Sequence, residues 1–201
     1  EDAVNLPQYV SLGMTAQRNA VVLLDNSSSA LPLAAETRIF VDGLALSVAA
    51  NYGTVVDTPE QADVVLLFLN TVFNGNQPAG TDSTFDQMMA TRFPDTNLAF
   101  SDEILAKAAS YSDVSQLVTL VDLNRPAVLT ELKGMSGALV GTFGVSDEAM
   151  LDVVFGRHNP VGKLPFELPS SMAEVAAQLE DVPDDTANPL FPYGWGLAYE
   201  K

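Results

Sequence analysis

The sequence Val64-Val65-Leu66-Leu67-Phe68-Leu69 decides the fold of this chain. An unbroken apolar run of this length is typical of a strand that is buried on both faces. Strands of this kind belong to parallel sheets whose two faces are covered by helices. Further strand patterns at 21–24, 37–41, 117–122 and 137–142 alternate with helical patterns, so the chain is expected to have an α/β fold.

Helical patterns occupy residues 9–20, 44–50, 101–112, 126–132, 146–155 and 170–179. Ser101 and Ser146 can cap two of these helices, and acidic residues follow each serine in the first turn. We therefore expect a three-layer α/β sandwich: a mostly parallel sheet, helices on both faces, and a turn-rich C-terminal tail that wraps the core. Residues 1–201 are expected to form a single domain, with a core of about 8–156 and a tail of about 157–201.

Composition limits the possible functions. The 26 acidic and 9 basic residues give a net charge of −17, which argues against nucleic acid and anionic membranes as partners. The absence of cysteine excludes disulfides and thiolate chemistry. One histidine and scattered acids do not predict a metal site. Neither the phosphate-loop lysine nor dinucleotide spacing accompanies the glycines at 134–144, so no cofactor is expected.

Residues 70–100 interrupt the α/β alternation. They follow the strand at 64–69, and ligands of such sheets bind beyond the carboxyl ends of the strands. Irregular segments of this length are uncommon in compact domains and are often functional. The segment contains no glutamate, and its only carboxylates are Asp82, Asp86 and Asp95.

Two motifs mark the tail: Gly-Arg-His-Asn-Pro-Val-Gly-Lys-Leu-Pro at 156–165 and Pro-Leu-Phe-Pro-Tyr-Gly-Trp-Gly-Leu-Ala-Tyr at 189–199. The Asn-Pro and Val-Gly pairs of the first are turn dipeptides. The glycines of the second, Gly194 and Gly196, permit positive φ or close backbone approach. Both motifs can serve only to fold the tail onto the core; alternatively, the aromatic residues of the second face a sugar.

In this order the two motifs resemble the C-terminal signature of glycoside hydrolase family 3, the β-glucosidases and related exo-acting glycosidases. The resemblance extends to residues 16–26, Ala-Gln-Arg-Asn-Ala-Val-Val-Leu-Leu-Asp-Asn, and to Gln-Ala-Asp-Val at 61–64. It therefore covers nearly the whole chain. It implies the α/β-sandwich C-terminal domain of a β-glucosidase or exo-β-glucanase.

The resemblance also implies where the chemistry lies. Members of the family carry an aspartate nucleophile on an N-terminal barrel domain, and nothing in this chain corresponds to that domain. Their acid/base residue, usually a glutamate, comes from a C-terminal-domain loop that matches 70–100. Here Asp82 and Asp86 are the candidates for that role, unless they are solvated loop acids.

Three aromatic residues, Phe73, Phe85 and Trp195, are the candidates for substrate binding, with loop packing as the alternative for the two phenylalanines. His158, the sole histidine, is expected to be a turn residue and not a catalytic base. A Ser-His-Asp triad is unlikely because no Gly-x-Ser-x-Gly elbow occurs.

The resemblance implies one part of a two-domain hydrolase. The chain would complete the pocket of a barrel domain, in cis or as a separate chain, and act on β-glucosides or short glucans. Alone it is expected to be inactive or nearly so. The alternatives are a non-catalytic glycan-binding module and a generic ligand-binding domain, although the latter leaves the tail motifs unexplained. A periplasmic or secreted location is implied by the resemblance alone, because residues 1–7 lack the features of a signal peptide.

Overall fold

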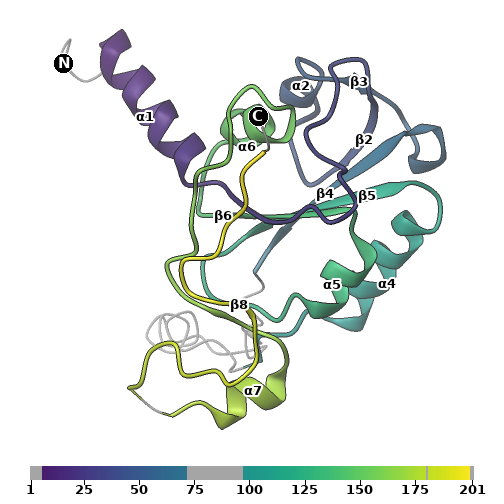
Figure 1. Cartoon of the computed structure of the whole chain (residues 1–201). Helices are drawn as coiled ribbons and strands as arrows, with labels where there is room; N and C mark the ends of the chain where they lie inside the picture. Colours follow the sequence, from purple (N-terminus) through teal and green to yellow (C-terminus); the bar gives the residue numbers. More distant parts are fainter. Residues whose placement is uncertain (1–5, 72–96, 180, 200–201) are drawn as a thin grey trace, which may run out of the picture.

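The computed structural model describes residues 6–71, 97–179 and 181–199 (Figure 1). In this part of the chain the centre is a six-stranded sheet with the order β1-β6-β5-β4-β2-β3. Its strands are β1 (Val22–Asp25), β2 (Arg38–Asp42), β3 (Thr54–Val55), β4 (Val64–Asn70), β5 (Gln116–Asp122) and β6 (Ala138–Thr142). All neighbouring strands are parallel except β1, which pairs antiparallel with β6 at one edge.

Alternate residues of β4 point to opposite faces of the sheet, and both faces are covered. Val64 and Leu66 belong to an apolar cluster that includes α2 (Leu46–Ala49) and α6 (Asp147–Val154). Val65 and Leu67 belong to a second cluster that includes α4 (Asp102–Ser112) and α5 (Thr130–Met135). Figure 1 shows these helix pairs on either side of the sheet. The predicted sandwich is confirmed.

The sequence pattern predicted the positions of most helices correctly. Ser101 accepts a hydrogen bond from the Ile104 amide, and Ser146 accepts one from the Ala149 amide, so both predicted caps are confirmed. The helix predicted at 126–132 is wrong in its first half, because α5 begins only at Thr130. There Val128 forms a parallel bridge with Ala99. Long-range backbone pairing therefore overrides the local helical pattern.

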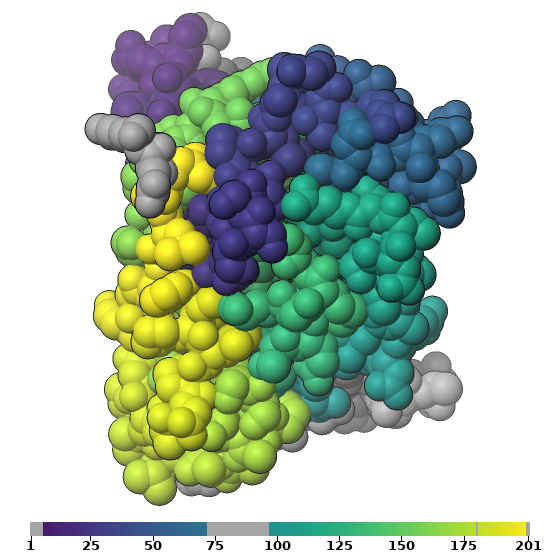
Figure 2. All heavy atoms as spheres, turned by 45° about the vertical axis from the view of Figure 1, so that its right-hand side comes forward, coloured from purple at the N-terminus to yellow at the C-terminus, as the bar shows by residue number. Residues whose placement is uncertain are grey.

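The two tail motifs contact each other. The Leu164 amide donates to the Trp195 carbonyl at 2.8 Å, and the Gly194 amide donates to the Leu164 carbonyl at 2.9 Å. The second motif also reaches the first strand, since the Leu197 amide donates to the Leu23 carbonyl at 2.8 Å. Figure 2 shows the tail in yellow running over the surface beside the chain that follows β1. Between the motifs lie β7 (Leu168–Pro169), α7 (Met172–Ala177) and β8 (Pro189–Phe191).

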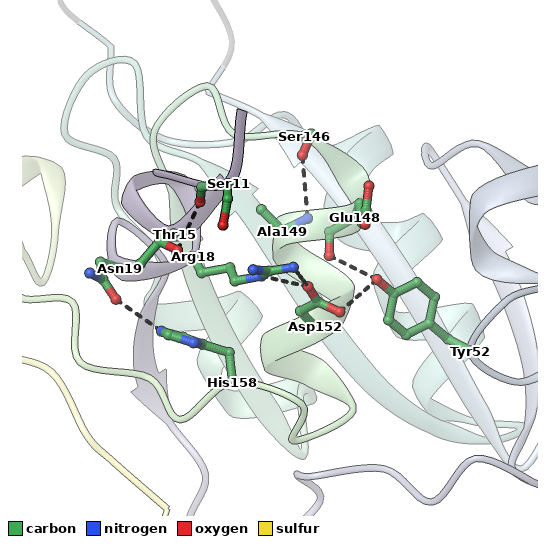
Figure 3. A network of polar contacts seen from close by, with 10 residues as sticks. All are labelled: Ser11, Thr15, Arg18, Asn19, Tyr52, Ser146, Glu148, Ala149, Asp152 and His158. Carbon is green, nitrogen blue, oxygen red and sulfur yellow. Dashed lines mark hydrogen bonds and ion pairs between the residues drawn. The ribbon is translucent and has the colours of Figure 1, made fainter. Parts of the chain in front are cut away.

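Helix α1 (Pro7–Asn19) is fastened to α6 by a buried carboxylate (Figure 3). Asp152, which is 5% exposed, accepts hydrogen bonds from Arg18 Nε at 2.6 Å and from the Tyr52 hydroxyl at 2.8 Å. Burial and the hydrogen bond to Asp152 raise the pKa of Tyr52 well above its usual range, so this hydroxyl stays a donor. Beside the network, His158 Nε2 lies 2.9 Å from Asn19 Oδ1.

We expect Asp152→Ala to lower the free energy of unfolding by up to about 3–5 kcal/mol, because it leaves the half-buried Arg18 charge and the buried Tyr52 hydroxyl without their partner. Guanidinium unfolding measures this loss. The matched control is Asp63→Ala, which breaks an Arg38–Asp63 pair whose side chains are 55% and 47% exposed. An exposed pair contributes under about 1 kcal/mol. Equal losses in the two variants would contradict the account of the network.

The crossing of the tail motifs leaves no room for a side chain at Gly196. A methyl group there would collide with the carbonyl oxygen of Gly162, so Gly196→Ala is expected to destabilise by about 1–3 kcal/mol. Gly134→Ala in α5 is the control, since no heavy atom lies within 4 Å of its Cβ position. That change should stabilise by about 0.4–1 kcal/mol. Urea unfolding of both variants tests the opposite signs.

Candidate functional site at the carboxyl edge of the sheet

Three polar residues end the three central strands side by side. In the sheet register Asn70 of β4 lies opposite Asp122 of β5, and Asp122 lies opposite Thr142 of β6. Ligands of parallel α/β sheets bind beyond this edge, which we call the carboxyl edge. The chain leaves β4 here and continues into residues 72–96.

Asp122 organises the carboxyl edge. Its side chain is nearly buried, with the residue 6% exposed. Oδ1 accepts the Gly144 amide at 2.6 Å, and Oδ2 accepts Asn124 Nδ2 at 2.7 Å. Both oxygens are therefore engaged in holding the loops that leave β5 and β6. The arrangement makes Asp122 a positioning group and not a free acid.

The described residues on both sides of segment 72–96 are fixed at this edge. On one side the Thr71 amide donates to the Asp122 carbonyl at 3.0 Å. On the other side Ala99 forms a parallel bridge with Val128, and the Val128 amide donates to the Leu98 carbonyl at 3.0 Å. The described residues that flank the segment are therefore held in place, one at the end of β5 and the other at the chain that follows β5.

Thr71 brings an unsatisfied polar group to the carboxyl edge. The residue is 3% exposed, and Oγ1 makes no hydrogen bond to any residue that the structure describes. A buried hydroxyl without a partner costs about 1–3 kcal/mol. A hydrogen-bonding group supplied from outside the described residues would be stabilising at this point. Close by, Arg125 Nη2 donates to the Asn97 carbonyl at 2.6 Å.

A second carboxylate, Asp42, ends β2 and is also engaged. Its Oδ2 accepts the Tyr111 hydroxyl at 2.9 Å and lies 2.5 Å from Lys107 Nζ. Both partners belong to α4. Burial and the hydrogen bond to Asp42 raise the pKa of Tyr111 to about 12. This contact fastens α4 to the end of β2.

A concave surface is formed mostly by residues of the C-terminal tail, and we call it the tail pocket. Its volume is about 420 Å³, and it is lined by Pro126, Pro165, Phe166, Glu167, Gln178, Leu179, Val182, Pro183, Asp184 and Tyr193. Tyr193 is 63% exposed, whereas Glu167 is 7% exposed. Glu167 Oε1 accepts the Thr186 amide at 2.8 Å and Gln178 Nε2 at 3.3 Å. Apolar and aromatic walls with few polar groups are typical of small-ligand sites.

The structure describes only one of the five predicted site residues. Asp82, Asp86, Phe73 and Phe85 lie outside the described residues, so their roles stay predictions. Trp195 is 37% exposed, and its Nε1 donates to the Leu24 carbonyl at 2.8 Å. Its ring lies 5.8 Å from that of Phe191, centroid to centroid. Trp195 thus covers edge strand β1 and keeps part of its surface exposed.

Sequence reasoning did not single out Asp122 or Glu167, and it included Tyr193 only among the aromatic residues of the second tail motif that could face a sugar. The sequence contained a signal for Asp122, because this residue is an acid at the end of a long buried strand. Glu167 and Tyr193 come together only through the fold of the tail, so their spacing in the sequence carried no signal. In the described part of the chain no cluster of three or more acidic or histidine side chains could hold a metal ion.

The fold and the polar carboxyl edge define a class: an α/β sandwich with a candidate site beyond the ends of its parallel strands. A family model described as the glycosyl hydrolase family 3 C-terminal domain matches residues 48–199. The chain belongs to this family. Among the described residues no helix has the length and apolar character needed to cross a membrane.

Relatives with named activities are considerably longer than this chain. Beta-glucosidase C of Emericella nidulans is 42% identical over 198 residues, which are 96% of this chain and 30% of that protein. The periplasmic beta-glucosidase/beta-xylosidase of Dickeya chrysanthemi is 38% identical, and the match covers 98% of this chain and 30% of that protein. The chain therefore spans about a third of the length of these relatives.

Solved structures confirm the fold. The beta-glucosidase from Listeria innocua in complex with isofagomine superposes with a TM-score of 0.72. The match covers 98% of this chain and 35% of that one, at 20% identity. At this identity the similarity concerns the fold alone.

The raised pKa of Tyr111 predicts a loss of stability in alkali. The folded state favours the neutral phenol, so this stabilisation is present below about pH 10, the usual tyrosine pKa, and is lost as the pH rises towards 12. Urea unfolding of wild type and Tyr111→Phe between pH 8 and 12 measures it. The wild-type stability should fall more steeply than that of the variant. Parallel curves would show that the contact with Asp42 does not control the titration.

Proposed function

We propose that this chain is the C-terminal domain of a β-glucosidase-like glycoside hydrolase and completes the substrate pocket of an N-terminal barrel domain. The observation that carries the proposal is the anchoring of Thr71 and Leu98, on the two sides of segment 72–96, at the carboxyl edge. That segment holds Asp82 and Asp86. The relatives named as β-glucosidases, of which the chain spans about 30%, supply the reaction: hydrolysis of O-glycosidic bonds.

Glycoside hydrolysis uses two carboxyl groups on either side of the glycosidic bond. Asp42 and Asp122, the carboxylates that end two described strands, are committed to hydrogen bonds and an ion pair. Neither is suited to exchange a proton with a substrate. We assign the acid/base role to Asp82 or Asp86 and the nucleophile to the barrel domain. The isolated chain is accordingly inactive or nearly so.

The substrate in this proposal is a β-glucoside or a short glucan, contacted by Phe73, Phe85 and Trp195. The barrel domain belongs to the same polypeptide or to a separate chain. Nucleic acid and membrane are not partners, consistent with the net charge of −17. The location is periplasmic or secreted, a proposal supported by the Dickeya chrysanthemi and Salmonella typhimurium relatives, whose names call them periplasmic.

The tail pocket favours one alternative, a glycan-binding module without catalysis. Exposed Tyr193 and half-buried Phe166 offer aromatic surface, and the Glu167 carboxylate lies in the same wall. Such a combination suits a ring with one apolar face and several hydroxyl groups. A module of this kind would bind a saccharide by itself and need no barrel domain.

A chimera tests the proposal. In the Emericella nidulans enzyme, the region that matches this chain is replaced by this chain. The chimera should hydrolyse a chromogenic β-glucoside, and the isolated chain should not. Because loss of general acid/base catalysis costs about 10²–10⁴-fold, Asp82→Asn or Asp86→Asn should lower kcat by that amount.

Asp95→Asn is the matched control, since it removes the third carboxylate of segment 70–100 and should leave kcat unchanged. Unchanged turnover in both the Asp82 and Asp86 variants would overturn the acid/base assignment. An inactive chimera, together with calorimetric binding of a β-linked gluco-oligosaccharide by the isolated chain, would favour the module.

A further inference from the structure

Helix α1 carries an apolar stripe that its own fold does not cover. Tyr9, Leu12, Gly13 and Ala16 follow the i, i+3, i+4, i+7 pattern of one helix face. Tyr9 is 54% exposed and Leu12 is 66% exposed, and the two small residues are exposed as well. No residue of α1 is buried. Figure 1 shows the helix extending from the body, with its amino end farthest away.

Two polar contacts at the end of α1 hold the helix in place. Arg18 pairs with Asp152, and Gln17 Oε1 accepts the Ser146 amide at 2.8 Å. Both contacts come from the last turn (Figure 3 shows the Arg18 pair). A surface helix ordinarily turns its apolar face to the core and its polar face to water. In α1 the apolar side chains of the stripe stay exposed, while the Arg18 pair, on the other side of the helix, fixes the orientation of the helix.

Charge is also absent from the exposed part of the helix. Residues 7–17 contain no Asp, Glu, Lys or Arg, although the chain as a whole has a net charge of −17. Depletion of charge distinguishes the centre of a protein interface from other surface. A helix of 13 residues is also marginally stable in water unless its apolar face is packed. Both facts indicate that the stripe is covered in the working protein.

The shape of the stripe suits a second helix. No heavy atom lies within 4 Å of the Cβ position of Gly13, so the centre of the stripe is open. Small residues such as Gly13 and Ala16 let another backbone come close, while Tyr9 and Leu12 can fill its grooves. A barrel domain of the (β/α) type presents an outer ring of helices. Such a domain offers the surface that this stripe requires.

We propose that the apolar stripe of α1 packs against an outer helix of the N-terminal barrel domain. The inference rests on the proposed function, which supplies that domain. The relatives support the choice of occupant, because they match over about 30% of their length and the matched family is a C-terminal domain. Most of each relative's chain therefore lies on the amino side of the matching region, where α1 is the first described element.

Hydrogen–deuterium exchange of the chimera and of the isolated chain tests this inference. Backbone amides of 10–16 should exchange at least about tenfold more slowly in the chimera, because docking removes local opening of the helix. Leu12→Glu should return the exchange in the chimera to the rate of the isolated chain. Val10→Glu is the matched control: Val10 is 57% exposed on the same helix but lies off the stripe, so the slow exchange should persist.

Equal exchange in the folded chimera and the isolated chain, or equal effects of the two glutamate variants, would overturn the inference. Concentration-dependent dimerisation of the isolated chain that Leu12→Glu abolishes would also overturn the inference, since the occupant would then be a second copy.

If the chimera does not fold, binding is measured instead by sedimentation of the isolated chain mixed with the separately produced N-terminal part of the Emericella nidulans enzyme. Failure of the wild-type chain to bind that part would contradict the docking of α1. The activity of the chimera is measured separately. Slow exchange in α1 of an inactive chimera would contradict the proposed function and leave the docking intact. Fast exchange in α1 of an active chimera would contradict the docking and leave the proposed function intact.

Discussion

Burial of the central strands on both faces is the constraint on which the rest of the structure depends. Because helices cover each side of β4, β5 and β6, the strand interiors admit almost no polar group, and polar side chains collect where the strands end. Asn70, Asp122 and Thr142 meet at one edge for this reason. The burial that stabilises the core thus also assembles the polar edge to which Thr71 is hydrogen-bonded.

A second feature is that buried polar contacts fix the orientation of helix α1. Asp152 joins α1, α6 and the chain after α2 through Arg18 and Tyr52, where apolar packing alone would leave the rotation of α1 undefined. A buried ion pair adds little net stability when compared with a well-packed apolar substitute. In this structure the ion pair fixes the orientation of α1 against α6 and leaves the apolar stripe on the other side of the helix exposed.

Local signals predicted the strands, the serine caps and the two-sided burial, because each depends on neighbouring residues. The sequence could not predict contacts made across the fold. Pairing of Val128 with Ala99 displaced the start of α5, and the tail pocket joins Pro126 to Tyr193. The tail motifs are recognisable as patterns, yet their mutual contact through Leu164 and Trp195 appears only in three dimensions. Asp82 and Asp86 lie outside the described residues, so their assignment as acid/base candidates rests on the sequence.

The position of β1 has a consequence for biosynthesis. This first strand pairs with β6 and with Leu197, so both its neighbours are made long after it. At about 5–20 residues per second, Leu197 follows Leu23 by roughly 10–35 s. During that interval an apolar strand waits without its partners, and unpaired strands of this kind are prone to aggregate. Residues 22–25 therefore stay without their strand partners until β6 and Leu197 have been synthesised.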